Sequence, residues 1–191
     1  MILVTGGARS GKSQFAEEIV SQKYKNILYI ATSIPFDDEM KLRIELHKKR
    51  RPKNWFTYEG FKNIDKVIYE SKEDCILFDC ITIFITNLIF EYAKNPENMT
   101  REDFLNTEKR IIEDFKNIIK AVKETGKEIV FVTNEIGMGI VPENKLSRNF
   151  RDIAGKINQI AGKESDEVYM TICGIPIKIK WGLICNFLYL H

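Results

Sequence analysis

Eight residues near the start of the chain have the types and spacing of a phosphate-binding loop. They are Gly6-Gly7-Ala8-Arg9-Ser10-Gly11-Lys12-Ser13, and they match the pattern G-x-x-x-x-G-K-[ST]. Glycine lets the backbone curl, so that several N–H groups can point at phosphate oxygens. The pattern predicts that Lys12 reaches the β- and γ-phosphates and that the Ser13 hydroxyl ligates Mg²⁺. A chance match is disfavoured, because an apolar run precedes the loop and a helical pattern follows it.

An acidic residue ends a second apolar run. The stretch Cys75-Ile76-Leu77-Phe78-Asp79 has the pattern of a buried strand with a carboxylate at its end. Beside a phosphate-binding loop, such a carboxylate can hold Mg²⁺ directly or through water. We therefore predict Asp79 as the second metal-binding residue, with a solvated acid at a strand end as the alternative.

The basic stretch that follows residue 47 could surround a nucleophile. His47 is the only histidine apart from the C-terminal residue, and Lys48, Lys49, Arg50 and Arg51 follow it. Nearby cations disfavour an imidazolium, so a neutral imidazole could attack phosphorus near pH 7. The same cations would neutralise charge in the transition state. A solvated histidine at the basic end of a helix explains the same residues, and the pattern alone leaves both interpretations open.

Three further groups could contact a substrate. Glu59 follows an aromatic stretch and could accept hydrogen bonds from a guanine edge, or be an ordinary surface acid. Gly137-Met138-Gly139 could form a substrate loop, although a bare G-x-G is a weak pattern. Arg148 and Arg151 lie one helical turn apart and could clamp phosphate, or pair with Asp152 or solvent.

Alternating strands and helices are expected to position these residues. Apolar runs predict strands at 1–5, 26–32, 55–59, 74–79, 128–133 and 168–173. Periodic apolar residues predict helices at 14–23, 82–92 and 146–160, and another that begins at a Thr100 cap and ends near Gly126. A helix at 37–51 is predicted by the acids at its start, the bases at its end and the following Pro52.

Strands that are apolar throughout are covered on both faces of a sheet. We therefore predict a three-layer α/β domain of the P-loop NTPase type, built around a mostly parallel sheet. Ligands of such sheets bind beyond the carboxyl ends of the strands. The residues expected to converge there are Thr5, Gly6, Thr32, Ser33, Asp79, Thr133 and Asn134.

Composition narrows the class of protein. With 191 residues and a 44% hydrophobic fraction, the chain can form one domain with a sizeable core. A net charge of +2 argues against a nucleic-acid binder. Four separated cysteines predict buried free thiols in a reducing compartment rather than a zinc site. A phosphate-loop pattern that begins at residue 6 leaves no room for a signal peptide, and no apolar run could span a bilayer, so we expect a cytoplasmic protein.

Together these motifs resemble the bifunctional adenosylcobinamide kinase / adenosylcobinamide-phosphate guanylyltransferase family of cobalamin biosynthesis. The resemblance spans residues 1 to about 180, and the combination of motifs is highly specific. It is carried by segments 2–13, 29–33, 37–40, 43–44, 47–48, 51–52, Trp55, 86–88, 132–135, 137–144 and 150–155.

The resemblance implies two reactions. A nucleoside triphosphate, ATP or GTP, phosphorylates the hydroxyl of the aminopropanol arm of adenosylcobinamide. GTP then donates GMP to that phosphate, giving adenosylcobinamide-GDP and pyrophosphate. In the family the guanylyl group passes through a histidine phosphoramidate, and the matching residue here is His47.

The same resemblance implies the nucleotide contacts, the metal and the assembly. The metal is Mg²⁺ on Ser13 and Asp79, and similar proteins assemble as homotrimers. The implied nucleotide contacts are Gly6 to Ser13, Thr32, Ser33, Lys48, Lys49, Arg50, Arg51, Glu59 and Asp79.

The chain departs from the family at its C-terminus. Similar chains end near residues 177–180, whereas here Trp181 to His191 continues and is largely apolar. We therefore expect a kinase/guanylyltransferase domain over 1–180 and an extension over 181–191 that covers a surface, joins a subunit interface or reflects an altered reading frame.

Two other functions compete. A phosphate-loop kinase of another small metabolite would use Lys12, Ser13 and Asp79 but not His47. A non-catalytic GTP switch protein would need N-K-x-D and D-x-x-G motifs. Here Asn144-Lys145-Leu146-Ser147 lacks the aspartate and Asp79-Cys80-Ile81-Thr82 lacks the glycine, so that function ranks low.

Overall fold

The computed structural model describes residues 1–33, 52 and 54–182. The predicted helix over 37–51 lies outside these residues, and with it His47 and the basic run Lys48 to Arg51. Residues 183–191 of the C-terminal extension also lie outside them.

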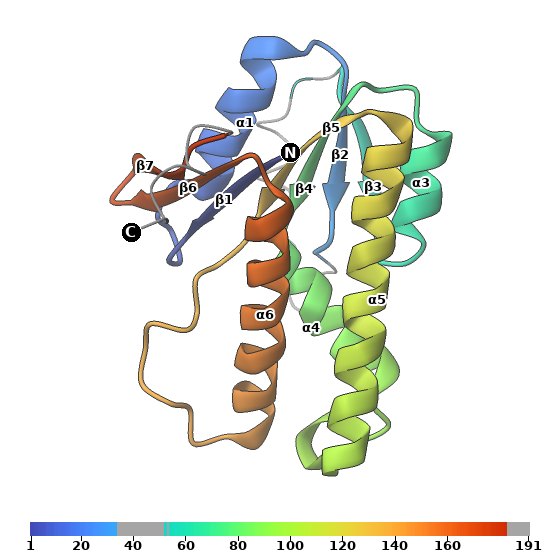
Figure 1. Cartoon of the computed structure of the whole chain (residues 1–191), viewed down its shortest axis with the longest axis vertical. Coiled ribbons are helices and arrows are strands. Elements are labelled where there is room, and N and C mark those ends of the chain that lie inside the picture. The colour runs from blue at the N-terminus through green and yellow to red at the C-terminus, as the bar shows by residue number, and fades with distance from the viewer. Residues whose placement is uncertain (34–51, 53, 183–191) are drawn as a thin grey trace, which may run out of the picture.

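A seven-stranded sheet of order β3-β2-β4-β5-β1-β6-β7 forms the centre of the described structure (Figure 1). Every neighbouring pair is parallel except β6 and β7, which form an antiparallel edge hairpin. The strands are β1 Ile2–Gly6, β2 Ile27–Ala31, β3 Phe56–Glu59, β4 Cys75–Asp79, β5 Glu128–Val132, β6 Glu167–Ile172 and β7 Ile175–Lys180.

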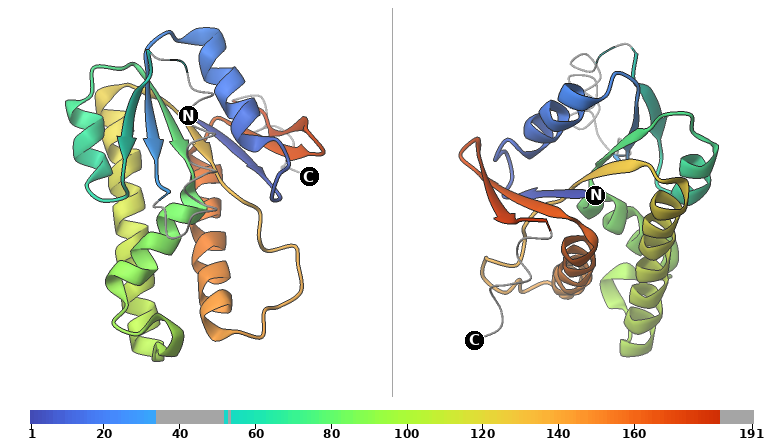
Figure 2. Two further views of the ribbon diagram at one scale, coloured as in Figure 1. Left: turned by 180° about the vertical axis from the view of Figure 1, so that it is seen from behind. Right: turned by 45° about the horizontal axis from the view of Figure 1, so that its top comes forward.

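Helices cover both faces of this sheet (Figures 1 and 2). Successive side chains of a strand point to opposite faces, so alternate residues enter two separate cores. Val4, Tyr29 and Leu77 pack with α1, whereas Leu3, Ile76 and Phe131 pack with the helices of the other face. The helices are α1 Lys12–Lys23, α3 Ile64–Glu70, α4 Ile81–Tyr92, α5 Arg101–Thr125 and α6 Lys145–Glu164, with a 3₁₀ turn η1 at Pro96–Asn98. The predicted three-layer α/β domain with a mostly parallel sheet is confirmed.

Local signals set the ends of the longest helix. The Thr100 hydroxyl accepts from the Asp103 amide, and the Asp103 carboxylate accepts from the Thr100 amide. Gly126 ends the helix in a left-handed conformation. The predicted capping residues of α5 are thus confirmed at both ends.

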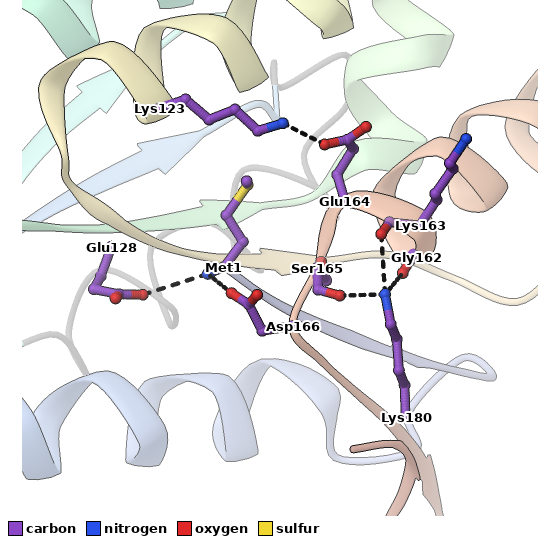
Figure 3. Close-up of polar contacts among 9 residues, drawn as sticks. All are labelled: Met1, Lys123, Glu128, Gly162, Lys163, Glu164, Ser165, Asp166 and Lys180. Atoms are coloured by element: carbon purple, nitrogen blue, oxygen red, sulfur yellow. Dashed lines mark hydrogen bonds and ion pairs between the residues drawn. The ribbon is translucent and has the colours of Figure 1, made fainter. Parts of the chain in front are cut away.

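The amino-terminal end of the sheet is held by charged groups (Figure 3). Lys180 Nζ at the end of β7 donates to the carbonyls of Gly162, Lys163 and Ser165, at 2.9, 2.9 and 2.5 Å. A cation at the carboxyl end of α6 satisfies carbonyls that have no partner within the helix. The Met1 ammonium lies 2.9 Å from Asp166 Oδ2. These contacts lie at the end of the sheet opposite to the phosphate-binding loop.

Three features differ from the expectations drawn from the sequence. Helix α3 was not predicted, although Ile64, Val67 and Ile68 have helical spacing in a short segment. Strand β6 is parallel to β1 as predicted but is not the last strand, because β7 follows it. Cys75 and Cys80 are buried free thiols, whereas Cys173 is exposed in the β6–β7 turn, so the expectation of buried cysteines was wrong for Cys173. In the part of the chain described here, no helix is long and apolar enough to cross a bilayer.

The aromatic cluster under α5 sets a stability test. Phe131 is 1% exposed, and its ring centroid lies 5.6 Å from that of Phe78 and 5.4 Å from that of Phe115. Phe131→Ala should lower the free energy of unfolding by about 3–5 kcal/mol, because it removes buried area and leaves a cavity. Urea denaturation measures the loss. Phe56→Ala, at a side chain that is 56% exposed, is the matched control and should change little.

Candidate functional site

The phosphate-binding loop connects β1 to α1 as the sequence predicts. Gly11 stands before α1 at φ 95°, a conformation that glycine tolerates best, and no described side chain caps the helix. The dipole of α1 places partial positive charge at this end of the helix, which favours an anion there. Lys12 is 8% exposed, and its Nζ donates to the Gly7 carbonyl at 2.6 Å. Its ammonium thus lies against the backbone of the loop.

The β6–β7 turn holds this loop in place. The Gly174 amide donates to the Ser10 carbonyl at 3.0 Å, and the hydroxyls of Ser10 and Thr171 are 2.8 Å apart. A Cβ placed on Gly11 would lie 3.2 Å from the Gly174 Cα. Sequence reasoning missed this support. Gly174 marks a turn, but only the structure shows that the turn contacts the loop.

The predicted metal-binding residues meet beside the loop. Ser13 Oγ lies 3.4 Å from Asp79 Oδ1, and the Tyr29 hydroxyl donates to Asp79 Oδ2 at 2.7 Å. A hydroxyl and a carboxylate are the oxygen ligands that Mg²⁺ prefers, so these residues fit that ion. Tyr29 is itself buried, and its ring stacks on Trp55 with centroids 6.2 Å apart. The Asp79 carboxylate is therefore fixed from both sides.

Thr32 and Ser33 follow β2 at the same edge. Thr32 is fully buried, and its hydroxyl accepts from the Cys80 amide and donates to the Cys80 carbonyl, both at 2.9 Å. Its amide donates to the Asp79 carbonyl at 3.1 Å, and its own carbonyl accepts from Asn87 Nδ2 at 2.7 Å. The Thr32 side chain thus holds the backbone around Asp79, whereas Ser33 is half-buried beyond it.

The thiol beside Asp79 does not have the properties of a nucleophile. Cys80 is buried, and burial, followed by the Asp79 charge, raises its pKa to about 11. Burial likewise raises the pKa of Cys75 to about 12. Both remain neutral thiols at physiological pH, and the Cys80 sulfur lies 3.1 Å from the Thr82 hydroxyl.

The remaining predicted residues have different surroundings. Glu59 ends β3 and is exposed at the same edge, opposite Ala31 in register. Arg148 Nη1 donates to the carbonyls of Pro142 and Glu143, at 2.9 and 2.5 Å, so it holds the 134–144 loop. Arg151 Nε is 3.9 Å from Asp152 Oδ1, too far for a hydrogen bond. Among the residues described, the predicted loop, Thr32, Ser33, Glu59 and Asp79 therefore share one edge of the sheet.

A cavity of about 340 Å³ lies elsewhere, between α3, α4 and α5. Its walls include the Lys62–Glu91 ion pair and Tyr92, whose hydroxyl donates to Asp114 at 2.5 Å. None of its lining residues is among the predicted nucleotide contacts.

The phosphate-binding loop and the contact between Ser13 and Asp79 are typical of a nucleotide-binding site. Comparison with known proteins identifies the family. Residues 2–179 match the family model described as cobinamide kinase / cobinamide phosphate guanyltransferase. The chain belongs to this family. It is therefore a bifunctional transferase, with cobinamide kinase and cobinamide phosphate guanylyltransferase activities.

Curated relatives agree along nearly the whole chain. The chain is 44% identical to the bifunctional adenosylcobalamin biosynthesis protein CobU of Escherichia coli, with 94% of this chain and 99% of that protein covered. It is 46% identical to the protein of the same name from Salmonella typhimurium, with the same coverage. Bifunctional adenosylcobalamin biosynthesis protein CobP of Pseudomonas aeruginosa is 33% identical, over 93% of this chain and 96% of that one.

Solved structures with little sequence identity share the fold. An ATPase of a bacterial type III secretion system aligns with a TM-score of 0.50 at 11% identity, covering 88% of this chain and 50% of that one. The Pyrococcus horikoshii protein PH0250 aligns with a TM-score of 0.51 at 9% identity, covering 95% and 86%. The cobinamide transferase therefore has a fold that other proteins also use.

The contact between Gly11 and Gly174 yields a binding test. Gly11→Ala forces a side chain into a left-handed conformation, which costs about 1–2 kcal/mol, and places it against the β6–β7 turn. We expect the affinity for GTP to fall at least about tenfold, measured by calorimetric titration. Gly126→Ala is the control, since it has the same backbone strain at φ 67° but lies at the end of α5. It should lower stability and leave GTP affinity unchanged.

Proposed function

We propose that one phosphate cradle, Gly6 to Ser13, serves both reactions of this cobinamide kinase / guanylyltransferase. The contact of Ser13 with Asp79 beside Lys12 is the observation that carries the proposal. Loop amides and Lys12 bind the triphosphate, and Glu59 at the exposed end of β3 accepts hydrogen bonds from the guanine edge. Thr32, Ser33, Lys48, Lys49, Arg50 and Arg51 complete the nucleotide contacts.

In the kinase reaction the aminopropanol hydroxyl of adenosylcobinamide attacks the γ-phosphorus of ATP or GTP. A new P–O bond forms, the bond to the β-phosphate oxygen breaks, and the nucleoside diphosphate leaves with that electron pair. The hydroxyl proton is released to solvent. Lys12 and the loop amides keep the phosphates in line and offset the charge that develops on the leaving oxygen.

In the transferase reaction His47 attacks the α-phosphorus of GTP. A P–N bond forms, the bond to the β-phosphate oxygen breaks, and pyrophosphate leaves. A phosphate oxygen of adenosylcobinamide phosphate then attacks the same phosphorus, so that a P–O bond replaces the P–N bond and the imidazole is restored. The basic run after His47 favours an uncharged imidazole with a free lone pair.

Ser13 and Asp79 are the residues that would hold Mg²⁺. When bound, the ion neutralises phosphate charge. Tyr29 is a positioning residue for the carboxylate, because its hydroxyl donates to Asp79 Oδ2. We also propose a cytoplasmic homotrimer, which sedimentation should reveal as a particle of about three times 22.2 kDa.

Replacing His47 separates this function from that of a simple metabolite kinase. With α-labelled GTP, we expect the wild-type protein to acquire label that is acid-labile and base-stable, as a phosphoramidate is. His47→Ala should acquire none, while its phosphorylation of adenosylcobinamide persists, because only the guanylyl step needs the imidazole. A wild-type protein that phosphorylates cobinamide but never acquires label would support the metabolite kinase without guanylyl transfer.

Asp79→Asn tests the proposed metal ligand. The amide keeps the shape of the side chain but removes its charge, so the Mg²⁺ concentration for half-maximal activity should rise about 10- to 100-fold in both reactions. Titration of each activity with Mg²⁺ measures the change. Asp152→Asn, at an exposed carboxylate on α6, is the control and should leave the Mg²⁺ requirement as it is. An Asp79→Asn enzyme with the wild-type requirement would contradict the assignment.

A further inference from the structure

The loop over 134–144 begins directly beside the phosphate cradle. The Glu135 amide donates to the Gly6 carbonyl at 3.0 Å, just as the Thr133 amide donates to Val4. From there the loop projects past the carboxyl edge of the sheet and returns to the start of α6 (Figures 1 and 2). A substrate that meets a nucleotide in the cradle from this side would lie along the loop.

Both ends of this loop are fixed. At its start, Glu135 accepts from the Gly137 amide at 2.6 Å. At its end, Arg148 holds two loop carbonyls, and the Asn144 side chain accepts from the Ser147 amide at 3.0 Å to cap α6. The loop is therefore a defined surface between these points.

The middle of the loop exposes apolar side chains to solvent. Met138 is 78% exposed, Ile140 97% and Val141 59%. Three large apolar residues so close in sequence, at the edge where the reaction occurs, are typical of a surface that a ligand covers. Charged ATP or GTP phosphates do not match such a surface, so the second substrate is the better candidate.

The face of α6 toward this loop carries a cation and an open position. Arg151, Gly155 and Asn158 are spaced four and three residues apart and share a helix face. Asn158 fixes the orientation of that face, because its side chain accepts from Thr133 Oγ1 at 2.7 Å and donates to the Asn134 carbonyl at 3.2 Å. A Cβ on Gly155 would meet nothing within 4 Å. The Arg151 side chain is 22% exposed, and its Nε is beyond hydrogen-bond distance of Asp152 Oδ1.

We propose that the 134–144 loop and this face of α6 form the binding site for the corrinoid acceptor. Met138, Ile140 and Val141 cover the largely hydrocarbon face of the macrocycle. Arg151 binds the phosphate of adenosylcobinamide phosphate, the acceptor of the second reaction, because a planar guanidinium pairs with phosphate through two parallel hydrogen bonds. This site presupposes the two reactions proposed above.

The assignment predicts a division of labour between the two acceptors. Arg151 contacts the phosphate, so it matters only for adenosylcobinamide phosphate. The apolar loop contacts the macrocycle, so it matters for both acceptors. Neither contacts GTP, so transfer of GMP from GTP to the enzyme should need neither.

The test separates these steps in the full-length enzyme. Arg151→Ala should raise the KM for adenosylcobinamide phosphate about 10- to 100-fold, as expected for a lost charge-assisted contact, and leave the KM for adenosylcobinamide in the kinase reaction unchanged. The KM of Arg151→Lys for adenosylcobinamide phosphate should lie between those of the wild type and Arg151→Ala, since lysine keeps the charge but lacks the planar guanidinium. Ile140→Ser should raise the KM for both acceptors. All three variants should accept label from α-labelled GTP at the wild-type rate.

Two control variants remove a cation and an exposed isoleucine that lie outside the proposed acceptor site. Lys163→Ala removes a cation from the far end of α6, and Ile179→Ser removes a 55% exposed isoleucine from β7. Both should retain wild-type KM values for the two acceptors.

Each outcome decides between the alternatives. An Arg151→Ala enzyme that discharges GMP to adenosylcobinamide phosphate with the wild-type KM overturns the site, as does one that no longer accepts label from GTP. A KM raised equally for both acceptors overturns the phosphate role of Arg151. A wild-type enzyme that never acquires label contradicts the proposed histidine intermediate instead, and the kinase measurements with Ile140→Ser then still test the acceptor surface.

Discussion

The close contact between the phosphate-binding loop and the β6–β7 turn is the constraint on which the rest of the site depends. At Gly6, an added Cβ would lie 2.5 Å from the Thr171 carbonyl oxygen, and at Gly11 it would meet the backbone of Gly174. The glycines are therefore needed for two reasons, the curl of the loop and the space left by the neighbouring hairpin. Since every residue of β1 pairs with β6, the hairpin and the loop are held in a single register.

This contact also explains how the amino-terminal and carboxyl-terminal parts of the chain cooperate. The loop follows β1, whereas its supports are Thr171 in β6 and Gly174 in the turn between β6 and β7. On the opposite side, Asp79 reaches Ser13 from β4, and Tyr29 from β2 holds its carboxylate. The cradle of eight residues therefore depends on strands from both halves of the sheet, together with the antiparallel hairpin at its edge.

Much of this arrangement could be predicted from the sequence because it depends on local patterns. The phosphate-binding loop, the acid at the end of β4 and the cap at Thr100 are each encoded by a few neighbouring residues. The helix α3 escaped prediction because seven residues offer little periodicity. Strand β7 was also missed, although Ile175, Ile177 and Ile179 alternate as in a strand.

What could not be predicted depends on contacts between distant segments. The nucleotide contact expected at Thr32 stays a prediction, but the sequence did not show that its hydroxyl is bonded to the Cys80 backbone, 48 residues away. Arg148 and Arg151 looked equivalent in sequence, yet Arg148 holds loop carbonyls while Arg151 does not reach Asp152. Spacing along a helix shows that two residues share a face, but not which partners the rest of the fold brings to that face.

The exposed thiol at Cys173 has a practical consequence. It lies next to Gly174, whose amide is bonded to the loop at Ser10, while Cys75 and Cys80 are buried. In a variant without Cys185, a maleimide fluorophore would attach selectively at this turn. The label would then stand beside the phosphate-binding loop, where its emission can be followed as nucleotide is added.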